Sequence, residues 1–250
     1  MQVKDSIKEY WDFRSATYTN GQIDRDERDR AAWIAWLRAC TGSDGGKKVL
    51  DVGTGPGFLA LLFAEMGHDV SALDLSDRMV ECARENAALR GLNVAVSQGD
   101  AESLPYPDAS FDIVASKYLL WTLPSPENAL AEWQRVLRPG GVVIAIDGEW
   151  HRDRGAIDRL RSRMTELPAL FRKADHHPVF RRSYDPIRQQ LPLYSLKSED
   201  LSRLFERCGL AEVSIKSMAS VYAEERKTLS LVERLAPVKP VYSITGRKVR

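Results

Sequence analysis

Three closely spaced glycines and a later aspartate are the residues of this chain whose types and spacing indicate chemistry. Gly53, Gly55 and Gly57 follow the apolar run at positions 49–52, and Asp74 ends the next apolar run. Glycine can adopt positive φ and exposes the main chain, so the free amides of a following helix can face a ligand. A carboxylate at the tip of the second strand accepts hydrogen bonds from ribose hydroxyls. The pattern indicates a site for a ligand that contains a nucleoside.

The glycine spacing leaves the identity of that ligand open. A dinucleotide fingerprint, G-x-G-x-x-G, would need a glycine at position 58, where this chain has Phe58. The third glycine is Gly57, which makes the pattern G-x-G-x-G. Asp74 would bind a ribose of NAD or of another nucleoside, and glycines also serve tight turns without a ligand.

Motifs further along the chain narrow the choice. They are GDAE at 99–102, PYPD at 105–108, FDIVAS at 111–116 and LRPGG at 137–141, which leads into an apolar run at 142–147. In order and wording these motifs resemble the class I S-adenosylmethionine-dependent methyltransferases, particularly the small-molecule group that includes the quinone-biosynthesis C-methyltransferases. The resemblance is close over residues 47–147 and loose in the flanks. It implies S-adenosyl-L-methionine as cofactor and methyl transfer to a small-molecule acceptor by in-line displacement.

The resemblance also implies a role for each cofactor-binding candidate. Gly53, Thr54 and Gly55 would line the amino-acid end of the cofactor, Asp51 would lie near its ammonium group and Asp74 would bind the ribose. Leu75 and Met79 would flank the adenine, and Asp100 would accept from its amino group with Ala101 and Glu102 beside it. The full set is Tyr18, Asp51, Gly53, Thr54, Gly55, Asp74, Leu75, Met79, Asp100, Ala101, Glu102 and Ser116. Ordinary packing or turn formation is the alternative for the apolar residues and for Asp100.

An aromatic-rich segment, EYWDFRSATY at 9–18, forms a second group of candidates. Related methyltransferases carry an aromatic N-terminal helix that closes over the cofactor. A tyrosine ring near a sulfonium gains cation-π attraction of about 0.5 to 2 kcal/mol, which favours Tyr18 as a cofactor contact. The alternative is that these aromatic residues only dock the helix on the domain.

The segment SKYLLW at 116–121 is expected to face the transferable methyl group. Methyl transfer needs close, aligned reactants and can proceed with few catalytic side chains. Many small-molecule relatives have a histidine where Trp121 lies, so this chain departs from the pattern there. Tyr118 and Trp121 are therefore candidates either for proton transfer or for shaping the acceptor pocket.

His176 and His177 are the remaining catalytic candidates, because an unperturbed imidazole titrates near pKa 6.5 and can accept a proton from an attacking group. Exposure in a polar loop is the alternative. Adjacent residues rarely point the same way and no acidic residue completes a ligand set, so no metal site is expected.

The charge balance argues against nucleic acid and membrane partners. Among 250 residues, 36 Lys plus Arg stand against 35 Asp plus Glu, so no global field draws the chain to an anionic surface. No apolar run approaches the roughly 20 residues that span a bilayer, and the polar start is not typical of a signal peptide. The three dispersed cysteines form neither a metal pair nor a disulfide framework. A cytoplasmic protein is expected.

Residues 151–197 are rich in arginine and proline and contain no strand-like run. The arginines indicate an anionic acceptor, such as a carboxylate or phosphate, or else a solvated helix face. With an RNA acceptor they would contact phosphates, and binding would weaken steeply with salt. An RNA or protein acceptor with the same cofactor, and a nucleotide-binding module without transfer activity, are thus the alternative functions.

Alternation of strands and helices predicts a parallel sheet with the ligand outside the carboxyl ends of its strands. The expected α/β fold is a Rossmann-like, seven-stranded, mostly parallel sheet with helices on both faces and, as the resemblance implies, an antiparallel last strand. Four parts are expected: an N-terminal helical cap at 1–46, a cofactor-binding core at 47–150, a helical lid insertion for the substrate at 151–197 and the rest of the core at 198–250. The oligomeric state is left open.

Helix boundaries are predicted from periodicity and from capping residues. Helices are expected at 7–18, 24–40, 58–66, 77–90, 128–137, 198–208 and 224–235, and the last strand at 241–248. Ser76, Ser125 and Ser198 are expected as N-caps, and Gly67 and Gly91 as helix ends.

Overall fold

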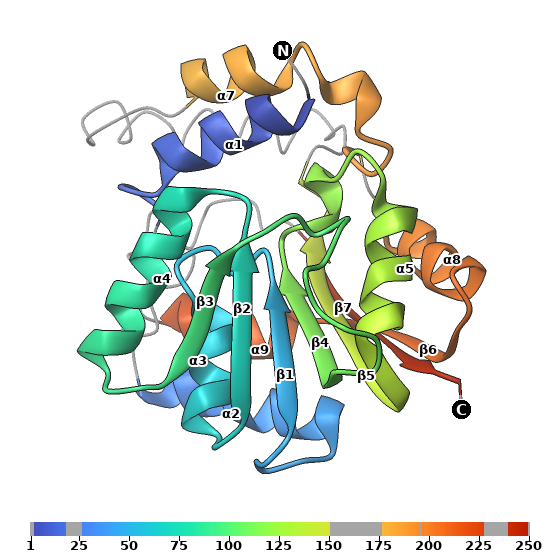
Figure 1. The fold of residues 1–250 in the computed structure, drawn as a ribbon. Coiled ribbons are helices and arrows are strands. Elements are labelled where there is room, and N and C mark those ends of the chain that lie inside the picture. Colours follow the sequence, from blue (N-terminus) through green and yellow to red (C-terminus); the bar gives the residue numbers. More distant parts are fainter. Residues whose placement is uncertain (1–2, 19–26, 151–176, 196, 228–239, 250) are drawn as a thin grey trace.

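The computed structural model describes residues 3–18, 27–150, 177–195, 197–227 and 240–249, which form one seven-stranded sheet with helices on both faces (Figure 1). The strand order is β3-β2-β1-β4-β5-β7-β6, and β7 runs antiparallel to the other six strands. The predicted fold class is confirmed. The strands are β1 (Lys48–Val52), β2 (Asp69–Asp74), β3 (Val94–Gln98), β4 (Phe111–Lys117), β5 (Leu137–Gly148), β6 (Leu210–Ser217) and β7 (Val241–Lys248).

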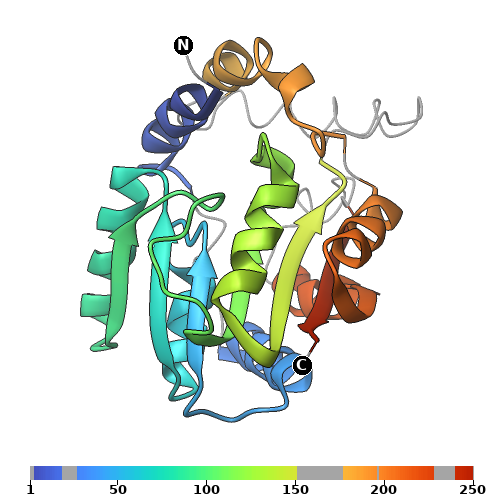
Figure 2. The same ribbon diagram turned by 45° about the vertical axis from the view of Figure 1, so that its right-hand side comes forward.

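Helices cover both faces of the sheet and its upper edge. The helices are α1 (Val3–Arg14), α2 (Glu27–Thr41), α3 (Phe58–Glu65), α4 (Asp77–Leu89), α5 (Pro126–Val136), α7 (His177–Tyr184), α8 (Ser198–Arg207) and α9 (Ala219–Lys227), with short 3-10 helices η1 (Leu120–Thr122) and η3 (Arg188–Gln190). One apolar core joins α5 and α8 to the sheet, and another joins α2, α3 and α9 to its other face. Helices α1 and α7 lie above the carboxyl ends of the strands (Figures 1 and 2).

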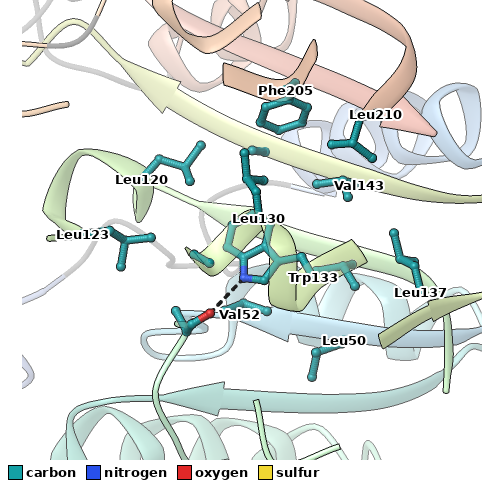
Figure 3. Packing of buried hydrophobic residues seen from close by; sticks show 14 of the residues in the cluster. Leu50, Val52, Leu120, Leu123, Leu130, Trp133, Leu137, Val143, Phe205 and Leu210 are labelled. Atoms are coloured by element: carbon teal, nitrogen blue, oxygen red, sulfur yellow. Dashed lines mark hydrogen bonds between the residues drawn. The ribbon is translucent and has the colours of Figure 1, made fainter. Parts of the chain in front are cut away.

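Trp133 of α5 anchors the first core and is completely buried between β-strand residues and α8 (Figure 3). Its indole N–H donates to the carbonyl of Ala101 over 3.2 Å. Buried indoles usually find such a partner, and here the partner is in the loop after β3. The core on this face therefore also holds the loop that carries Asp100 and Glu102.

The capping predictions are partly confirmed. The Ser76 side chain accepts from Met79 N at 3.1 Å and caps α4, and Gly67 and Gly91 end helices with φ of 81° and 63°. Ser125 takes the cap position of α5 without a side-chain cap bond. The prediction for Ser198 was wrong, because α8 already includes that residue and Lys197 takes the cap position.

Helix ends differ more from the predictions than strand positions do. Helix α1 ends at Arg14, so Tyr18 follows it outside the helix; α2 is described from Glu27 on, and the predicted start at 24 lies outside the described residues. The last predicted helix begins at Ala219, five residues before 224, and residues 228–235 lie outside the described part. Strand β5 begins at Leu137 rather than 142, because the LRPGG segment pairs with Phe111 before the main ladder starts. Periodicity places an element better than it places its ends.

The predicted lid is described only in its second half. Residues 177–195 contain α7 and η3, which agree with a helical segment, and residues 151–176 lie outside the described part. Among the described residues, no helix has both the length and the apolar character needed to cross a membrane.

Candidate active site

A cleft lies at the carboxyl ends of β1, β2 and β4, the place where open α/β sheets bind ligands. Eleven predicted site residues line it: Tyr18, Asp51, Gly53, Thr54, Gly55, Asp74, Leu75, Met79, Asp100, Ala101 and Tyr118. These residues lie far apart in the chain, and the order of the parallel strands brings them together. The cleft is the candidate cofactor site.

The glycine-rich turn forms the floor of the cleft. Gly53 has φ of 67°, and a Cβ there would meet the Leu119 side chain at 2.8 Å, so this position has no room for a larger residue. The amides of Gly53 and Thr54 donate to the Leu73 carbonyl at 2.9 and 3.0 Å, which ties the turn to β2. Gly55 has φ of 55°, and its Cβ would meet only Tyr18, at 3.9 Å. The turn is thus rigidly held on the sheet side and open on the cleft side.

Asp74, at the end of β2, holds the glycine-rich turn directly. Its Oδ2 accepts from Gly55 N at 2.8 Å and its Oδ1 from Ser76 N at 2.9 Å. Burial raises the pKa of this carboxyl to about 6, although the amide hydrogen bonds lower it. Each carboxylate oxygen has a second lone pair, so the group retains capacity for ribose hydroxyls.

Asp51, at the end of β1, is only 1% exposed. Its Oδ2 accepts from Thr54 Oγ1 at 2.7 Å and from Ala60 N, in the first turn of α3, at 3.0 Å. Burial raises the pKa of Asp51 to about 7, the charge of Asp74 adds to the rise, and the ammonium of Lys117 opposes it. A cationic ligand in the cleft would favour the ionised form of this carboxyl.

The far end of the cleft contains Asp100, but Glu102 does not line it. Lys4 of α1 bridges the two carboxylates, with its Nζ 2.6 Å from Asp100 Oδ2 and 2.6 Å from Glu102 Oε2. The other oxygen of Glu102 accepts from Ser125 N at 2.6 Å, at the start of α5. Glu102 therefore joins the loop after β3 to α1 and α5, while Asp100 remains in contact with the cleft.

Helix α1 closes the cleft from above with Trp11, which belongs to the predicted aromatic segment, and with Lys4 and Ile7, which the sequence did not single out. Lys4, Ile7 and Trp11 line the cleft, and their i, i+3, i+7 spacing places them on one helix face. This helical spacing in the sequence could have predicted that the three residues share one face of α1. The other cleft residues that were not selected are Pro56, Phe58, Leu59, Leu73, Gly99, Lys117, Leu119, Thr122, Leu123 and Pro124.

The loop after β4 contains the predicted catalytic residues Tyr118 and Trp121. Tyr118 lines the cleft with φ of 63°, its amide donates to Ile146 O at 2.7 Å and its hydroxyl hydrogen-bonds to that of Tyr222. The ammonium of Lys117 lies 3.9 Å from the Tyr118 ring centre. A positive φ in a tyrosine is strained and is found preferentially at functional sites.

Trp121 does not line the cleft. It is buried, and its ring stacks on that of Tyr184 in α7, with centroids 5.3 Å apart and an interplanar angle of 29°. Ser116 is also buried away from the cleft, and its Oγ has no hydrogen-bond partner among the described residues. The position of Trp121 suits shaping of the pocket rather than proton transfer.

The predicted histidine pair lies outside the described side chains. His176 is not described. His177 is the first residue of α7, and its side chain is not described. Among the described residues, no three His, Cys, Asp or Glu side chains are grouped as a metal site would need.

Comparisons with known proteins agree with this geometry. A family model described as a methyltransferase domain matches residues 50–145. A ubiquinone/menaquinone biosynthesis C-methyltransferase of Cupriavidus taiwanensis is 32% identical over 187 residues, which are 72% of this chain and 74% of that protein. A demethylmenaquinone methyltransferase of Thermus thermophilus is 39% identical over 103 residues, so the match spans 40% of this chain and about half (47%) of that relative.

Solved structures support the same fold. A putative methyltransferase from Bacillus halodurans superimposes with a TM-score of 0.59 at 22% identity, covering 87% of this chain and 99% of that one. A Haemonchus contortus phosphoethanolamine N-methyltransferase bound to S-adenosylhomocysteine gives 0.64 at 19% identity, covering 96% of this chain and 61% of that one. At these identities the likeness establishes the fold alone.

Fold, cleft and relatives together define a class I S-adenosylmethionine-dependent methyltransferase. The chain belongs to this family, within the small-molecule group that includes the quinone-biosynthesis C-methyltransferases. The predictions of family, enzyme class and cofactor are confirmed. The roles of individual site residues and the acceptor itself are developed below.

Proposed function

We propose that this enzyme transfers the methyl group of S-adenosyl-L-methionine to a small, ring-bearing, largely apolar acceptor of the quinol or phenol class. Three relatives are named for quinone or hydroquinone methylation, including a 2-methyl-6-phytyl-1,4-hydroquinone methyltransferase of rice that is 41% identical over 103 residues. The observation that carries the proposal is the cleft, which combines a glycine-rich floor and two buried carboxyls with aromatic side chains on the α1 side.

The residues of the cleft fit the cofactor. Asp51 would attract the ammonium group of the amino-acid end, and Asp74 would accept from the ribose hydroxyls, opposite the open side of Gly55. Asp100 would take the adenine amino group between Leu75 and Met79. The Tyr18 ring, next to Gly55, would lie near the sulfonium, which supplies an electrophilic methyl group when the cofactor is bound. We propose these cofactor contacts for Asp51, Asp74, Asp100 and Tyr18.

The acceptor would enter between α1 and the loop after β4. Tyr118 lies at the end of β4, beside the glycine-rich turn, where an attacking atom must align with the sulfur-methyl bond. We assign Tyr118 to direct contact with the acceptor and Trp121 to the shape of the pocket. A quinol loses a proton during the reaction. His176 and His177 remain the predicted residues that would take up this proton.

An anionic acceptor is supported less well. The described arginines of the predicted lid, Arg181, Arg182 and Arg188, are exposed and do not line the cleft. Cytoplasmic localisation likewise stays a prediction.

Methyl transfer from radiolabelled S-adenosylmethionine to a panel of acceptors tests the proposed function. The panel contains a short-chain menaquinol precursor, a simple phenol, a carboxylated phenol, phosphoethanolamine and total RNA. We expect S-adenosylhomocysteine to form with the quinol or the phenol, and to form no faster with the carboxylated phenol. Turnover confined to the amine or to RNA, with both ring acceptors inert, would contradict the proposal.

A further inference from the structure

We propose that Asp147 is the positioning residue of the acceptor side: its buried carboxylate fixes Trp121 and Trp150, and through them the aromatic wall next to Tyr118. This inference rests on the proposed function, because it assigns a role in acceptor binding. Asp147 lies near the end of β5, in its buried stretch, and accepts a hydrogen bond from the loop that follows β4. Neither its position nor its residue type was singled out in the sequence.

The carboxylate of Asp147 collects four N–H donors from two loops. Its Oδ1 accepts from the Trp150 indole at 2.7 Å and from Gly148 N at 2.8 Å. Its Oδ2 accepts from Trp121 N at 3.3 Å, and the backbone of Leu120 donates to the same carboxylate. One side chain therefore holds the loop after β4 to the loop after β5.

Aspartate suits this place because its carboxylate only accepts hydrogen bonds. An asparagine of the same shape would turn an NH₂ group toward N–H donors on one side. Asp147 is completely buried, and burial raises its pKa to about 7 despite the N–H donors. The titratable groups nearest to it along the strands are Glu149, two residues on, and Tyr242, opposite it in β7. A buried carboxyl held by uncharged donors is costly and is retained where geometry matters.

Both tryptophans lead from Asp147 to residues of the cleft. The Trp150 ring meets the Tyr118 ring edge-on, with centroids 4.6 Å apart at 83°. Trp121 stacks on Tyr184, whose hydroxyl accepts from the indole of Trp11 at 3.0 Å. Tyr118, from the loop after β4, and Trp11, from α1, both line the cleft. Asp147 thus lies behind both walls of the proposed acceptor pocket.

Contacts with the cofactor come from other elements. The glycine-rich turn, Asp74 and Asp100 belong to the ends of β1, β2 and β3, and none of them touches the Asp147 carboxylate through a hydrogen bond among the described residues. A change at Asp147 should therefore affect the acceptor and leave the cofactor in place. A purely structural role would instead weaken both ligands together.

The test compares Asp147→Asn with Asp112→Asn, a control at the opposite end of the sheet, where Asp112 pairs with Arg138. We expect Asp147→Asn to lower kcat/KM for the acceptor by roughly 100-fold, the order expected for a misplacement of about 1 Å. The Kd for S-adenosylhomocysteine, from calorimetry, should change less than about 2-fold, and the control should leave both values unchanged. Unchanged kcat/KM in Asp147→Asn, or an equal loss of cofactor affinity, would overturn the proposal.

A second variant, Trp150→Phe, removes one donor while the carboxylate stays. We expect it to lower kcat/KM in the same direction as Asp147→Asn, and full activity would count against the proposed role. In the free enzyme, the indole signal that Trp150→Phe removes should shift as the pH crosses about 7, and Asp147→Asn should lack that shift. Because this signal needs no acceptor, it separates failure of the Asp147 assignment from failure of the proposed reaction. A pH-independent Trp150 signal would overturn the assignment.

Discussion

We assign both a structural and a ligand-binding role to two carboxyls of the candidate cofactor cleft. Asp74 accepts from the Gly55 amide and Asp51 accepts from the first turn of α3, and both also line the cleft. Burial raises both pKa values, whereas ordinary surface carboxyls titrate near 4. Perturbed carboxyls in a cleft are typical of functional sites. Their substitution and their titration can be tested separately.

Replacement of Asp74 by alanine should weaken cofactor binding. A hydrogen bond to a charged group contributes about 1.5–3 kcal/mol, so the Kd for S-adenosylhomocysteine should rise by roughly 10-fold to 100-fold. Isothermal calorimetry measures this change. Asp69→Ala, at the exposed start of the same strand, is the matched control and should bind normally. An unchanged Kd in Asp74→Ala would refute the ribose assignment.

Cofactor affinity should rise with pH between about 5.5 and 8. The pKa values of Asp51 and Asp74 are raised to about 7 and about 6, so the free enzyme holds protons on them at lower pH. A ligand with a cationic ammonium and a sulfonium favours the ionised carboxyls and must expel these protons. Calorimetry at pH 6 in buffers of different ionisation enthalpy should detect proton release. Equal heats in all buffers would contradict this linkage.

At the scale of elements, helix α1 acts as a cap held by polar contacts. Lys4 bridges Asp100 and Glu102, while Lys8 pairs with both Asp12 and Asp77 at 2.8 Å. The Asp12 carboxylate also accepts from the Ser76 hydroxyl at 2.6 Å, at the start of α4. These contacts are partly exposed, so each is individually weak. Apolar packing of Ile7 and Tyr10 against Tyr184 adds to these polar contacts.

Lys4→Met should therefore speed release of the cofactor. Partly exposed ion pairs contribute about 0.2–1 kcal/mol each, which predicts dissociation up to about 5-fold faster in stopped-flow measurements at low salt. The difference should shrink at high salt, where screening weakens the wild-type pairs. Glu9→Gln, on the exposed side of α1, should dissociate at the wild-type rate. Equal rates for Lys4→Met and wild type at low salt would show that the cap does not limit release.

At the scale of the molecule, three carboxyls with raised pKa values should shape the pH dependence of stability. Asp51, Asp74 and Asp147 have pKa values raised to about 7, about 6 and about 7 in the folded protein, against about 3.9 in an unfolded chain. Between these values the folded state binds more protons than the unfolded state. The free energy of unfolding therefore falls as pH rises through this window.

The melting temperature of the cofactor-free enzyme should accordingly fall by several degrees between pH 5.5 and pH 8, at about 2–4 °C per kcal/mol for a chain of this size. Calorimetric scans check this directly. Asp147→Asn should show a smaller fall, because it removes one of the three groups. Asp12, Asp112 and Glu132, whose pKa values are lowered, act in the opposite sense only at more acidic pH. A melting temperature that rises toward pH 8 would contradict the role of the buried carboxyls.

Local sequence signals were enough for the fold and for the floor of the cleft. The strands, the glycine turn and Asp74 are read from short stretches of chain, because apolar runs, glycines and strand-end carboxylates act within a few residues of one another. The sheet has seven strands, mostly parallel with an antiparallel last strand, as expected, and eleven of the predicted site residues meet in one cleft. Helix ends were less accurate, since periodicity does not mark where a helix frays.

The walls of the cleft were decided by tertiary packing. Glu102 and Ser116 are turned away from the cleft, Trp121 supports it from behind, and Lys4 and Lys117 line it without any local motif for such a role. Their positions depend on where α1, α7 and the loop after β4 meet, which joins segments more than a hundred residues apart. The role of Asp147 also depends on tertiary packing. Its raised pKa and its hydrogen bonds arise only when burial removes water and two loops supply N–H donors. The sequence alone thus predicted the residues of the proposed cofactor side through local chemistry, whereas those of the proposed acceptor side emerged only from the tertiary structure.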